Sequence, residues 1–465
     1  MTELHEHSVT ELLAAFAGGD ADPRDAVAGC LARIDATDDA VHAWFHLTAD
    51  AALAAAESSS RRWRDGTQRP LEGVPFGVKD VIDTSGVVTT AGSRLYADRV
   101  PGRSATAVRR LTDAGAILIG KTATPEFAFG NEISETPVAN PWALDRWAGG
   151  SSSGSAAAVA ARQVPLCLGT DTGGSIRVPS SYCGVTGLKP TIGRVPRDGL
   201  HPVSWSFDHI GPIARSVDDV VVALSVLAGQ ADEDPRSSRR PADEILPTPG
   251  GLAGLRVGVA SGWFTGWGDP AVTAARDAAV EVLGGLGASV VPVDVSRAEQ
   301  AGTVAWMITV AEFAANHEAA ADDVDHISAS AMHRFIGGAR LSALDYLKAQ
   351  QVRVEIQEEL GELFGDVDVI VTPATPTPAP GFDPAEGFFE GGDRLWLDKV
   401  ARSFLIANVT GIPAMVLPAG IERGLPLSVQ FLGRPFDEAT LLRAGREYQR
   451  ATTHHLAAPT LEPRH

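Results

Sequence analysis

Two short segments rich in glycine, serine and threonine hold the side chains best suited to catalysis. The first is Gly149-Gly150-Ser151-Ser152-Ser153-Gly154-Ser155, and the second is Gly169-Thr170-Asp171-Thr172-Gly173-Gly174-Ser175. A flexible linker is the ordinary interpretation of such a run, but the first segment leads directly into an alanine-rich stretch that is typical of a helix. Because the backbone N–H groups at a helix start are unpaired, this position favours an anion or an oxyanion.

The second segment predicts a nucleophile beside a group of N–H donors. It follows an apolar run that ends at Leu168, and Gly173 and Gly174 allow a turn with positive φ. Successive N–H groups in such a turn point to one side and stabilise negative charge. Ser175 ends the turn, where its attack on a carbonyl would place the new oxyanion next to these donors.

A serine nucleophile needs a base, and the sequence favours a lysine over a histidine. His201 and His209 are the nearest histidines along the chain, and each is more consistent with a surface or core side chain. Lys79 follows an apolar run that would carry it to the point where a buried sheet meets the loops. Burial favours the neutral amine, which could accept the Ser175 proton through the hydroxyl of Ser151.

Three further motif matches are rejected on their context. Residues 115–122 fit the P-loop expression, but their four central residues are apolar and predict a buried strand. The GxSxG match centred on Ser152 lacks the preceding strand of a nucleophile elbow, because residues 145–148 are expected to form a loop. Asp171-Thr172-Gly173 resembles half of an aspartic protease site, and no second copy occurs to share the proton.

The elements around these motifs predict an α/β fold, in which strands and helices alternate after an N-terminal helical region. The expected helices are 8–17, one that Asp22-Pro23 begins, 49–64, 106–114, 153–162, 216–227, 301–321, 342–364 and 438–450. The expected strands are 74–78, 116–119, 164–168, 255–259, 289–293, 367–371, 414–417 and 427–432. The proline-rich stretch 372–380 should be neither helix nor inner strand, since its prolines lack donors.

We expect a single domain, residues 1–465, with three regions. These are an N-terminal helical region at 1–65, a core that holds the chemical motifs at 71–215, and a helical excursion at about 296–365 that lines the substrate side. The strand pattern resumes after the excursion, which favours one continuous sheet over two separate domains.

Composition and charge limit the classes of partner. The 465 residues are 44% hydrophobic, which suits a large globular core, and carry a net charge of −19. An acidic chain repels phosphate backbones, so we expect no nucleic-acid partner. The longest apolar runs fall short of the roughly 20 residues of a membrane span, so no membrane association is expected. Three scattered cysteines without a CxxC pair favour a reducing compartment, and we expect a cytoplasmic location.

Several long segments are similar to the amidase signature family. The matching segments are GVPFGVKD at 73–80, GGSSSGSAAAVAA at 149–161, GTDTGGSIRVPS at 169–180, CGVTGLKPT at 183–191, NVTGIPAMVLPAG at 408–420, SVQFL at 428–432 and GRPFDEATLL at 433–442. The resemblance extends over nearly the whole chain. It implies the amidase signature fold, a large central mixed β-sheet flanked by helices on both faces.

The resemblance also implies a Ser–cisSer–Lys triad. Ser175 would be the nucleophile, Ser151, preceded by a cis peptide bond, the proton relay, and Lys79 the base. The oxyanion hole would consist of the N–H groups of Thr172, Gly173, Gly174 and Ser175. The positions that would support the site are Ser152, Asp171 and Arg177, the last as a structural residue. The residues expected to contact substrate are Phe127, Ala128, Phe129, Asn131 and Trp205. No metal or cofactor is implied.

These residues predict an amidase that hydrolyses a C–N amide-type bond of a small molecule through an acyl-enzyme on Ser175. Activity should rise toward alkaline pH, because Lys79 must lose its proton. The expected partner is a small-molecule amide or carbamate substrate, and a homodimer is left open.

Three alternatives remain open. The same triad could hydrolyse a carbamate, a urea-like bond or an ester, and Ala128 between two phenylalanines suggests room for an apolar or aromatic acyl group. The chain could instead be the amidase-like component of a tRNA-dependent amidotransferase, although residues 331–353 only loosely resemble that protein and the segment around Trp205 differs from it. A scaffold without activity is disfavoured, because all three triad residues are present.

Overall fold

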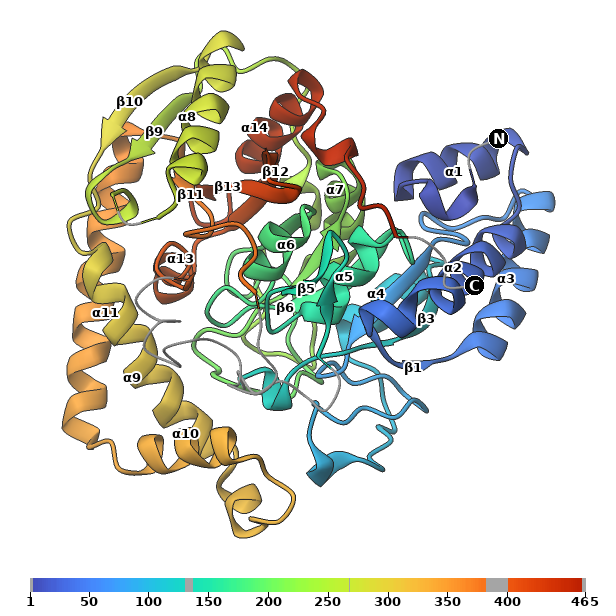
Figure 1. The fold of residues 1–465 in the computed structure, drawn as a ribbon, viewed down its shortest axis with the longest axis horizontal. Coiled ribbons are helices and arrows are strands. Elements are labelled where there is room, and N and C mark those ends of the chain that lie inside the picture. The colour runs from blue at the N-terminus through green and yellow to red at the C-terminus, as the bar shows by residue number, and fades with distance from the viewer. Residues whose placement is uncertain (1–2, 130–136, 267, 382–399, 462–465) are drawn as a thin grey trace.

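One mixed β-sheet forms the centre of the computed structural model, which describes residues 3–129, 137–266, 268–381 and 400–461 (Figure 1). Its strand order is β1-β3-β2-β6-β8-β7-β12-β13-β11-β9-β10. The strands of this sheet are β1 (Trp44–Leu47), β2 (Pro75–Lys79), β3 (Ile117–Thr122), β6 (Leu166–Thr170), β7 (Thr186–Lys189), β8 (Ile210–Ala214), β9 (Arg256–Ala260), β10 (Ser289–Val293), β11 (Val369–Pro373), β12 (Ala414–Glu422) and β13 (Leu425–Gly433). A separate two-stranded sheet consists of β4 (Ala139–Asn140) and β5 (Ala143–Trp147).

Helices lie on either side of the strands (Figure 1). The α-helices of the described chain are α1 (Val9–Gly18), α2 (Pro23–Val41), α3 (Ala49–Arg64), α4 (Thr106–Asp113), α5 (Ser153–Ala160), α6 (Arg177–Cys183), α7 (Val217–Leu227), α8 (Pro270–Gly285), α9 (Ala298–Asn316), α10 (Ala329–Ala339), α11 (Ala343–Asp366), α13 (Leu405–Thr410) and α14 (Glu438–Ala451). The predicted α/β fold with a large central mixed sheet is confirmed.

The side chains of β6 show why the sheet needs helices on both faces. Leu166 and Leu168 belong to a core cluster that includes Leu224 of α7, whereas Cys167 between them belongs to a cluster that includes Ala157 of α5. Neighbouring side chains of a strand point to opposite faces, so a strand whose successive side chains are all buried must be covered on both faces. All five residues of β6 are buried.

The N-terminal helices begin and end where local signals predict. Ser8 and Glu11 form a capping box at the start of α1, and Gly19 ends this helix in the left-handed conformation. Asp22 caps α2, with Pro23 in the first turn, where a missing N–H costs nothing. The helix predicted over residues 49–64 is observed as α3 with the same bounds.

The segment 115–122 confirms the prediction of a buried strand in place of a P-loop, since most of it forms β3. β3 and β6 pair in parallel with the two sides of β2. The carboxyl ends of these three strands therefore meet at one edge of the sheet, which is where α/β folds usually place ligands. Lys79 and Thr170 are the last residues of β2 and β6.

The prediction for residues 372–380 is wrong at its start. Thr372 and Pro373 belong to β11, which lies between β13 and β9 in the sheet and pairs there with Gln430 and Val429 of β13. Pairing with β9 ends at Val371. Pro373 therefore stands beyond the last β9 pair, where its missing N–H breaks no bond of that ladder.

The loop predicted over residues 145–148 is also wrong in part. Residues Ala143–Trp147 form β5, which pairs with β4. A strand thus precedes the GxSxG match after all, so a missing strand does not exclude Ser152 as a nucleophile. The two-residue partner strand β4 gives little sequence pattern, which explains why the hairpin was not predicted.

The helical excursion is present as α9, α10 and α11, coloured from yellow to orange in Figure 1. The helices predicted over residues 301–321 and 342–364 correspond to α9 and α11, while α10 was not predicted. α9 packs against both α10 and α11. In the part of the chain that the structure describes, no helix combines the length and apolarity that crossing a membrane requires.

Candidate active site

Lys79 lies fully buried at the end of β2, in contact with two hydroxyl groups. Its Nζ is 2.7 Å from Ser151 Oγ and 2.8 Å from Thr170 Oγ1. Burial lowers the pKa of Lys79 well below 10.5, although the charges of Asp171 and Asp208 act in the opposite direction. The surroundings thus favour the neutral amine, which can accept a proton from a hydroxyl.

Ser151 lies just before α5, where the first motif segment runs beside the segment that carries Ser175. The Gly150–Ser151 peptide bond is cis, as the resemblance implied. The Ser151 carbonyl accepts a 3.0 Å hydrogen bond from Thr124 Oγ1, and the N–H of Ser152 donates to the Ser175 carbonyl at 3.0 Å. The predicted nucleophile and relay are therefore held on neighbouring backbone segments.

The turn that ends at Ser175 offers unpaired N–H groups, but fewer than predicted. Gly174 adopts φ +113°, as a tight turn requires, and its N–H donates to Asp171 Oδ1 at 2.9 Å. Within the described residues, the N–H groups of Thr172, Gly173 and Ser175 have no acceptor, and neither does the Ser175 hydroxyl. Three of the four predicted oxyanion donors are thus free, whereas the Gly174 donor stabilises the turn.

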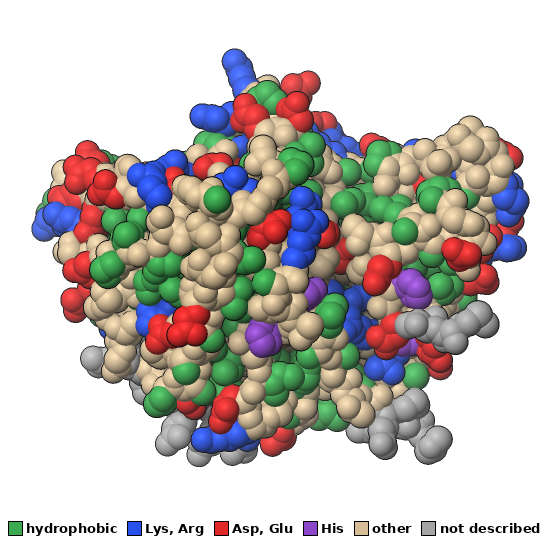
Figure 2. Space-filling model, turned by 90° about the horizontal axis from the view of Figure 1, so that it is seen from above, with side chains coloured by type: hydrophobic (Ala, Val, Ile, Leu, Met, Phe, Trp, Pro, Cys, Tyr) green, Lys and Arg blue, Asp and Glu red, His purple; other side chains and the backbone are tan. Residues whose placement is uncertain are grey.

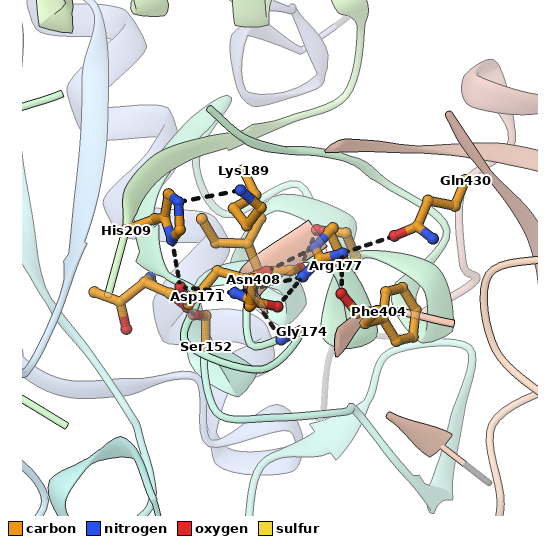
Figure 3. Close-up of polar contacts among 12 residues, drawn as sticks. Ser152, Asp171, Gly174, Arg177, Lys189, His209, Phe404, Asn408 and Gln430 are labelled. Atoms are coloured by element: carbon orange, nitrogen blue, oxygen red, sulfur yellow. Dashed lines mark hydrogen bonds and ion pairs between the residues drawn. The ribbon is translucent and has the colours of Figure 1, made fainter. Parts of the chain in front are cut away.

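Asp171 and Arg177 hold the two ends of this turn together (Figure 3). The Arg177 Nε is 2.9 Å from Asp171 Oδ2, and Nη2 is 3.0 Å from Oδ1. Asn408 Nδ2 donates to the same carboxylate at 2.8 Å. Burial alone would raise the pKa of Asp171, but the charge and hydrogen bonds of Arg177 hold this pKa well below its usual range.

Arg177 is further bonded to the C-terminal part of the chain. It donates to Asn408 Oδ1 at 2.6 Å, to Gln430 Oε1 at 2.8 Å and to the Phe404 carbonyl at 3.0 Å (Figure 3). These contacts agree with the structural role expected for Arg177, which stays a prediction. Asn408 and Gln430 lie in segments that matched the family, yet sequence reasoning gave neither of them a role.

Ser152 supports the site through the backbone of β6. Its side chain is inaccessible to solvent; Oγ donates to the Thr170 carbonyl at 3.1 Å and accepts from the Thr170 N–H at 3.2 Å. A hydroxyl engaged in both roles and closed to solvent is poorly placed to attack a substrate. These contacts fit the supporting position predicted for Ser152.

Of the two histidines nearest in sequence, His209 is buried and His201 is partly buried. His209 Nδ1 is 2.6 Å from the Phe207 carbonyl, and Nε2 is 3.1 Å from Lys189 Nζ (Figure 3). Burial and the Lys189 charge lower the pKa of His209 well below 6.5. His201 stacks on Phe127 at 5.4 Å, and burial lowers its pKa to about 3. In the described ranges, no three or more His, Cys, Asp or Glu side chains gather as metal ligands would.

The predicted acyl-pocket segment packs against the helical excursion. Phe127 is buried and stacks on His317, the residue that follows α9, at 4.7 Å between ring centroids. Phe129 lies 5.1 Å from Phe313 and 5.8 Å from Trp306 on the same helix. The positions of Phe127 and Phe129, which are predicted to contact the substrate, thus depend on packing against α9 and the residue that follows it.

The remaining predicted substrate residues differ in what the structure shows. Ala128 adopts a left-handed conformation with φ 56°. Trp205 is 38% exposed, and its carbonyl accepts a 2.8 Å hydrogen bond from Arg197 Nη1. Asn131 lies outside the described residues.

Sequence reasoning missed two polar contacts of the site. Thr170 touches the Lys79 amine, and Asp208 accepts a 2.6 Å hydrogen bond from Thr172 Oγ1. Thr170 carried a usable signal, because it is a hydroxyl residue at the end of a strand leading into the motif. Asp208 carried none, since 36 residues separate it from Thr172.

The chain is similar along its length to characterised proteins. It is 41% identical to the A subunit of the glutamyl-tRNA(Gln) amidotransferase of Chloroflexus aggregans, with 99% of each chain covered. The solved structure of the corresponding amidotransferase protein from Thermotoga maritima is 28% identical, with a TM-score of 0.83, and covers 100% of this chain and 99% of its own. An inhibitor-bound structure from work on a vestigial protein complex and the origins of an s-triazine catabolic enzyme is 36% identical, with a TM-score of 0.88, and covers 96% and 98%.

These relatives correct the prediction about partners. We expected a small-molecule substrate and no nucleic acid, whereas the curated relatives are named as subunits of an enzyme that acts on a tRNA. The net charge of −19 indicates what the surface of this chain attracts when it is alone. Net charge alone therefore does not exclude an acidic protein from an enzyme that acts on a nucleic acid, and the expectation of no nucleic acid drawn from it is wrong.

The family comparison agrees with the site. The model of the family described as Amidase matches residues 25–442, which include every segment that the sequence analysis matched and all the residues around Lys79, Ser151 and Ser175. The chain therefore belongs to the amidase signature family.

Proposed function

We propose that this chain is the amide-hydrolysing component of a tRNA-dependent amidotransferase, which releases ammonia from a donor amide through an acyl-enzyme on Ser175. The observation that carries the proposal is the similarity to the glutamyl-tRNA(Gln) amidotransferase relatives, at 41% identity over 99% of both chains. This alternative from the sequence analysis is better supported than the small-molecule amidase that we expected first.

The proposed reaction begins when the Ser175 hydroxyl attacks the amide carbonyl. Its proton passes to Ser151, whose own proton goes to the neutral amine of Lys79. The free N–H groups of the turn stabilise the oxyanion. The proton then returns to the leaving nitrogen, the C–N bond breaks, and ammonia departs. Water attacks the acyl-enzyme by the same relay and releases the acid.

Two features of the site support these roles. The 2.7 Å contact between Lys79 Nζ and Ser151 Oγ provides one step of the relay, and burial provides the neutral amine. Ser175 is 9% exposed and its hydroxyl is free, so it is available for a substrate. The same acyl-enzyme chemistry would serve a carbamate, a urea-like bond or an ester, and we propose a linear amide because the relatives are amidotransferase proteins.

Covalent labelling tests the nucleophile. A fluorophosphonate probe should label the wild-type protein at one site, and the Ser175→Ala variant should not be labelled or turn over any substrate. Ser58→Ala removes an exposed hydroxyl on α3 and is the matched control that should behave as wild type. Undiminished labelling of Ser175→Ala would exclude the proposed acyl-enzyme.

Activity measurements with and without partners test the assembly. The chain should co-purify with partner proteins encoded in its own host, and its release of ammonia from glutamine should increase when those partners and tRNA are added. A panel of primary amides, aryl amides, carbamates and esters is measured in parallel. Full activity of the isolated chain on one panel member, unaffected by tRNA and without any co-purifying partner, would contradict the proposal.

A further inference from the structure

Asp208 links the turn that carries Ser175 to the loop of residues 203–209. Asp208 is 3% exposed, and its Oδ1 accepts the 2.6 Å hydrogen bond from Thr172 Oγ1. Its Oδ2 accepts the N–H groups of Val203 and Ser204 at 3.0 Å each. Burial raises the pKa of Asp208 to about 6, so the carboxylate is ionised at neutral pH.

The bond to Asp208 holds Thr172 by its side chain while its backbone N–H stays free. Asp171, one residue earlier, is fixed by Arg177 and Asn408. A hydrogen bond to a β-branched side chain selects one χ1 rotamer and thereby restricts the backbone that carries it. The contacts of Asp171 and the hydrogen bond of the Thr172 side chain to Asp208 thus together restrict the direction of the Thr172 N–H.

Glu312 of α9 holds the loop that carries Asp208. It is 1% exposed, and its carboxylate accepts hydrogen bonds from the Ser204 hydroxyl and from the Ser206 N–H, the latter at 3.0 Å. It also accepts the Tyr346 hydroxyl of α11 at 2.9 Å. The loop is therefore attached to two helices of the excursion.

We propose that Asp208 is a positioning residue of the oxyanion hole, supported by Glu312. The two carboxylates connect the helical excursion to Thr172 and aim its N–H at the oxyanion that forms when Ser175 attacks. This inference rests on Ser175 as the nucleophile of the proposed function, but not on the identity of the amide or of the partner proteins.

The first test removes the Thr172 hydroxyl with little change of shape. Thr172→Val should slow fluorophosphonate labelling of Ser175, and lower kcat, by about 10- to 100-fold, the loss expected when a catalytic group is displaced by about 1 Å. KM should stay unchanged, because the oxyanion exists only after binding. Thr172→Ser keeps the hydroxyl and should restore most of the rate. Equal rates for the Val and Ser variants would overturn the inference.

The second test separates the role of Glu312 from general stability. Glu312→Gln should lower kcat at constant KM. Glu359→Gln is the matched control, because Glu359 also accepts backbone N–H groups, those of Ser296 and Arg297, but does not touch the 203–209 loop. Urea unfolding shows whether each variant is folded. Equal kcat values for the two folded variants would overturn the support role, and the Thr172 pair still tests the inference if Glu312→Gln does not fold.

The third test uses the charge of Asp208. The acidic groups that face Lys79 are Asp171 and Asp208, and Asp208 in turn faces Arg197. Because the Asp208 charge raises the pKa of Lys79, Asp208→Asn should move the acid limb of kcat/KM to lower pH as well as lower kcat. A loss of kcat with an unmoved acid limb would contradict this placement.

If the wild-type protein is not labelled at all, the proposed function fails; if it is labelled and Thr172→Val labels equally fast, only this inference fails.

Discussion

Lys79 is the residue whose chemistry depends most on its surroundings. An exposed lysine is protonated at neutral pH and cannot accept a proton, whereas burial lowers the pKa of Lys79 well below 10.5. The sequence predicted burial from the apolar run before it. The structure adds that both partners of the amine, Ser151 and Thr170, are neutral hydroxyl groups, which do not favour the charged form as carboxylates would.

The pH dependence of activity follows from this pKa. Since the neutral amine is the active form, kcat/KM should rise as the pH passes the pKa of Lys79 and reach its plateau well below pH 10.5. Lys79→Met should lose about 10²- to 10⁴-fold in kcat/KM, the usual contribution of a general base. The exposed Lys348→Met variant of α11 is the control and should match wild type. A plateau reached only near pH 10.5 would show that the lysine is charged in the folded protein.

The role of Ser152 is tested by removing its hydroxyl. Ser152→Ala leaves the buried N–H and carbonyl of Thr170 without this partner, which should cost about 1–3 kcal/mol in the free energy of unfolding. Fluorophosphonate labelling at Ser175 should remain, because we propose Ser175 and not Ser152 as the nucleophile. Urea unfolding and labelling are measured on the same protein. Complete loss of labelling in a folded Ser152→Ala variant would contradict the supporting role.

At the scale of elements, the nucleophile turn is held by parts of the chain that are far apart in sequence. Asp171 at the end of β6 pairs with Arg177 at the start of α6, and Arg177 reaches Asn408 of α13 and Gln430 of β13. These elements come together because β12 and β13 follow β7 in the sheet order. The turn geometry is thus a consequence of the strand order.

Removal of Arg177 should therefore cost more than removal of a surface arginine. Arg177→Met leaves the Asp171 carboxylate buried without its charge partner, which should lower the free energy of unfolding by about 3–5 kcal/mol. Arg61→Met, which removes an exposed partner of Glu57 on α3, should have a far smaller effect. Urea unfolding at pH 7 compares the two variants with wild type. Similar losses of unfolding free energy for both variants would show that the buried pair contributes no more to stability than the exposed pair.

At the scale of the whole molecule, one sheet places every part of the site. The carboxyl ends of β2 and β6 supply Lys79 and Thr170, and the C-terminal strands anchor the turn. On the face shown in Figure 2, acidic and basic side chains are interspersed with hydrophobic ones. This face therefore offers no broad basic surface to a phosphate backbone. The assignment of residues 1–465 to a single domain stays a prediction.

The buried lysine also makes the stability of the whole fold depend on pH. Between its folded pKa and 10.5, Lys79 is protonated in the unfolded chain and neutral in the folded one, so unfolding takes up a proton. The free energy of unfolding of the wild type, relative to Lys79→Met, should thus rise by about 1.4 kcal/mol per pH unit between the folded pKa and 10.5. Urea unfolding at several pH values measures the slope. Parallel profiles for wild type and Lys79→Met would mean that folded Lys79 keeps its proton.

The sequence by itself predicted the residues of the candidate site and determined most of the elements that carry them. Helix caps, glycine turns and apolar runs are local signals, so α1, α3 and the strand before Lys79 could be predicted from neighbouring residues. The family motifs then added the cis bond before Ser151 and the choice of Ser151 over Ser152 as the relay. A two-residue strand such as β4, or a strand that ends on a proline such as β11, gives no local signal, and there the predictions failed.

Only the tertiary structure decided which distant groups complete the site. Asn408 and Gln430 on Arg177, and Asp208 on Thr172, come from elements that meet through the strand order, which no local pattern contains. The structure also showed that the Gly174 N–H is engaged with Asp171 and is not a free oxyanion donor. Contacts of this kind depend on how the sheet is assembled, because the residues are close in space but far apart along the chain.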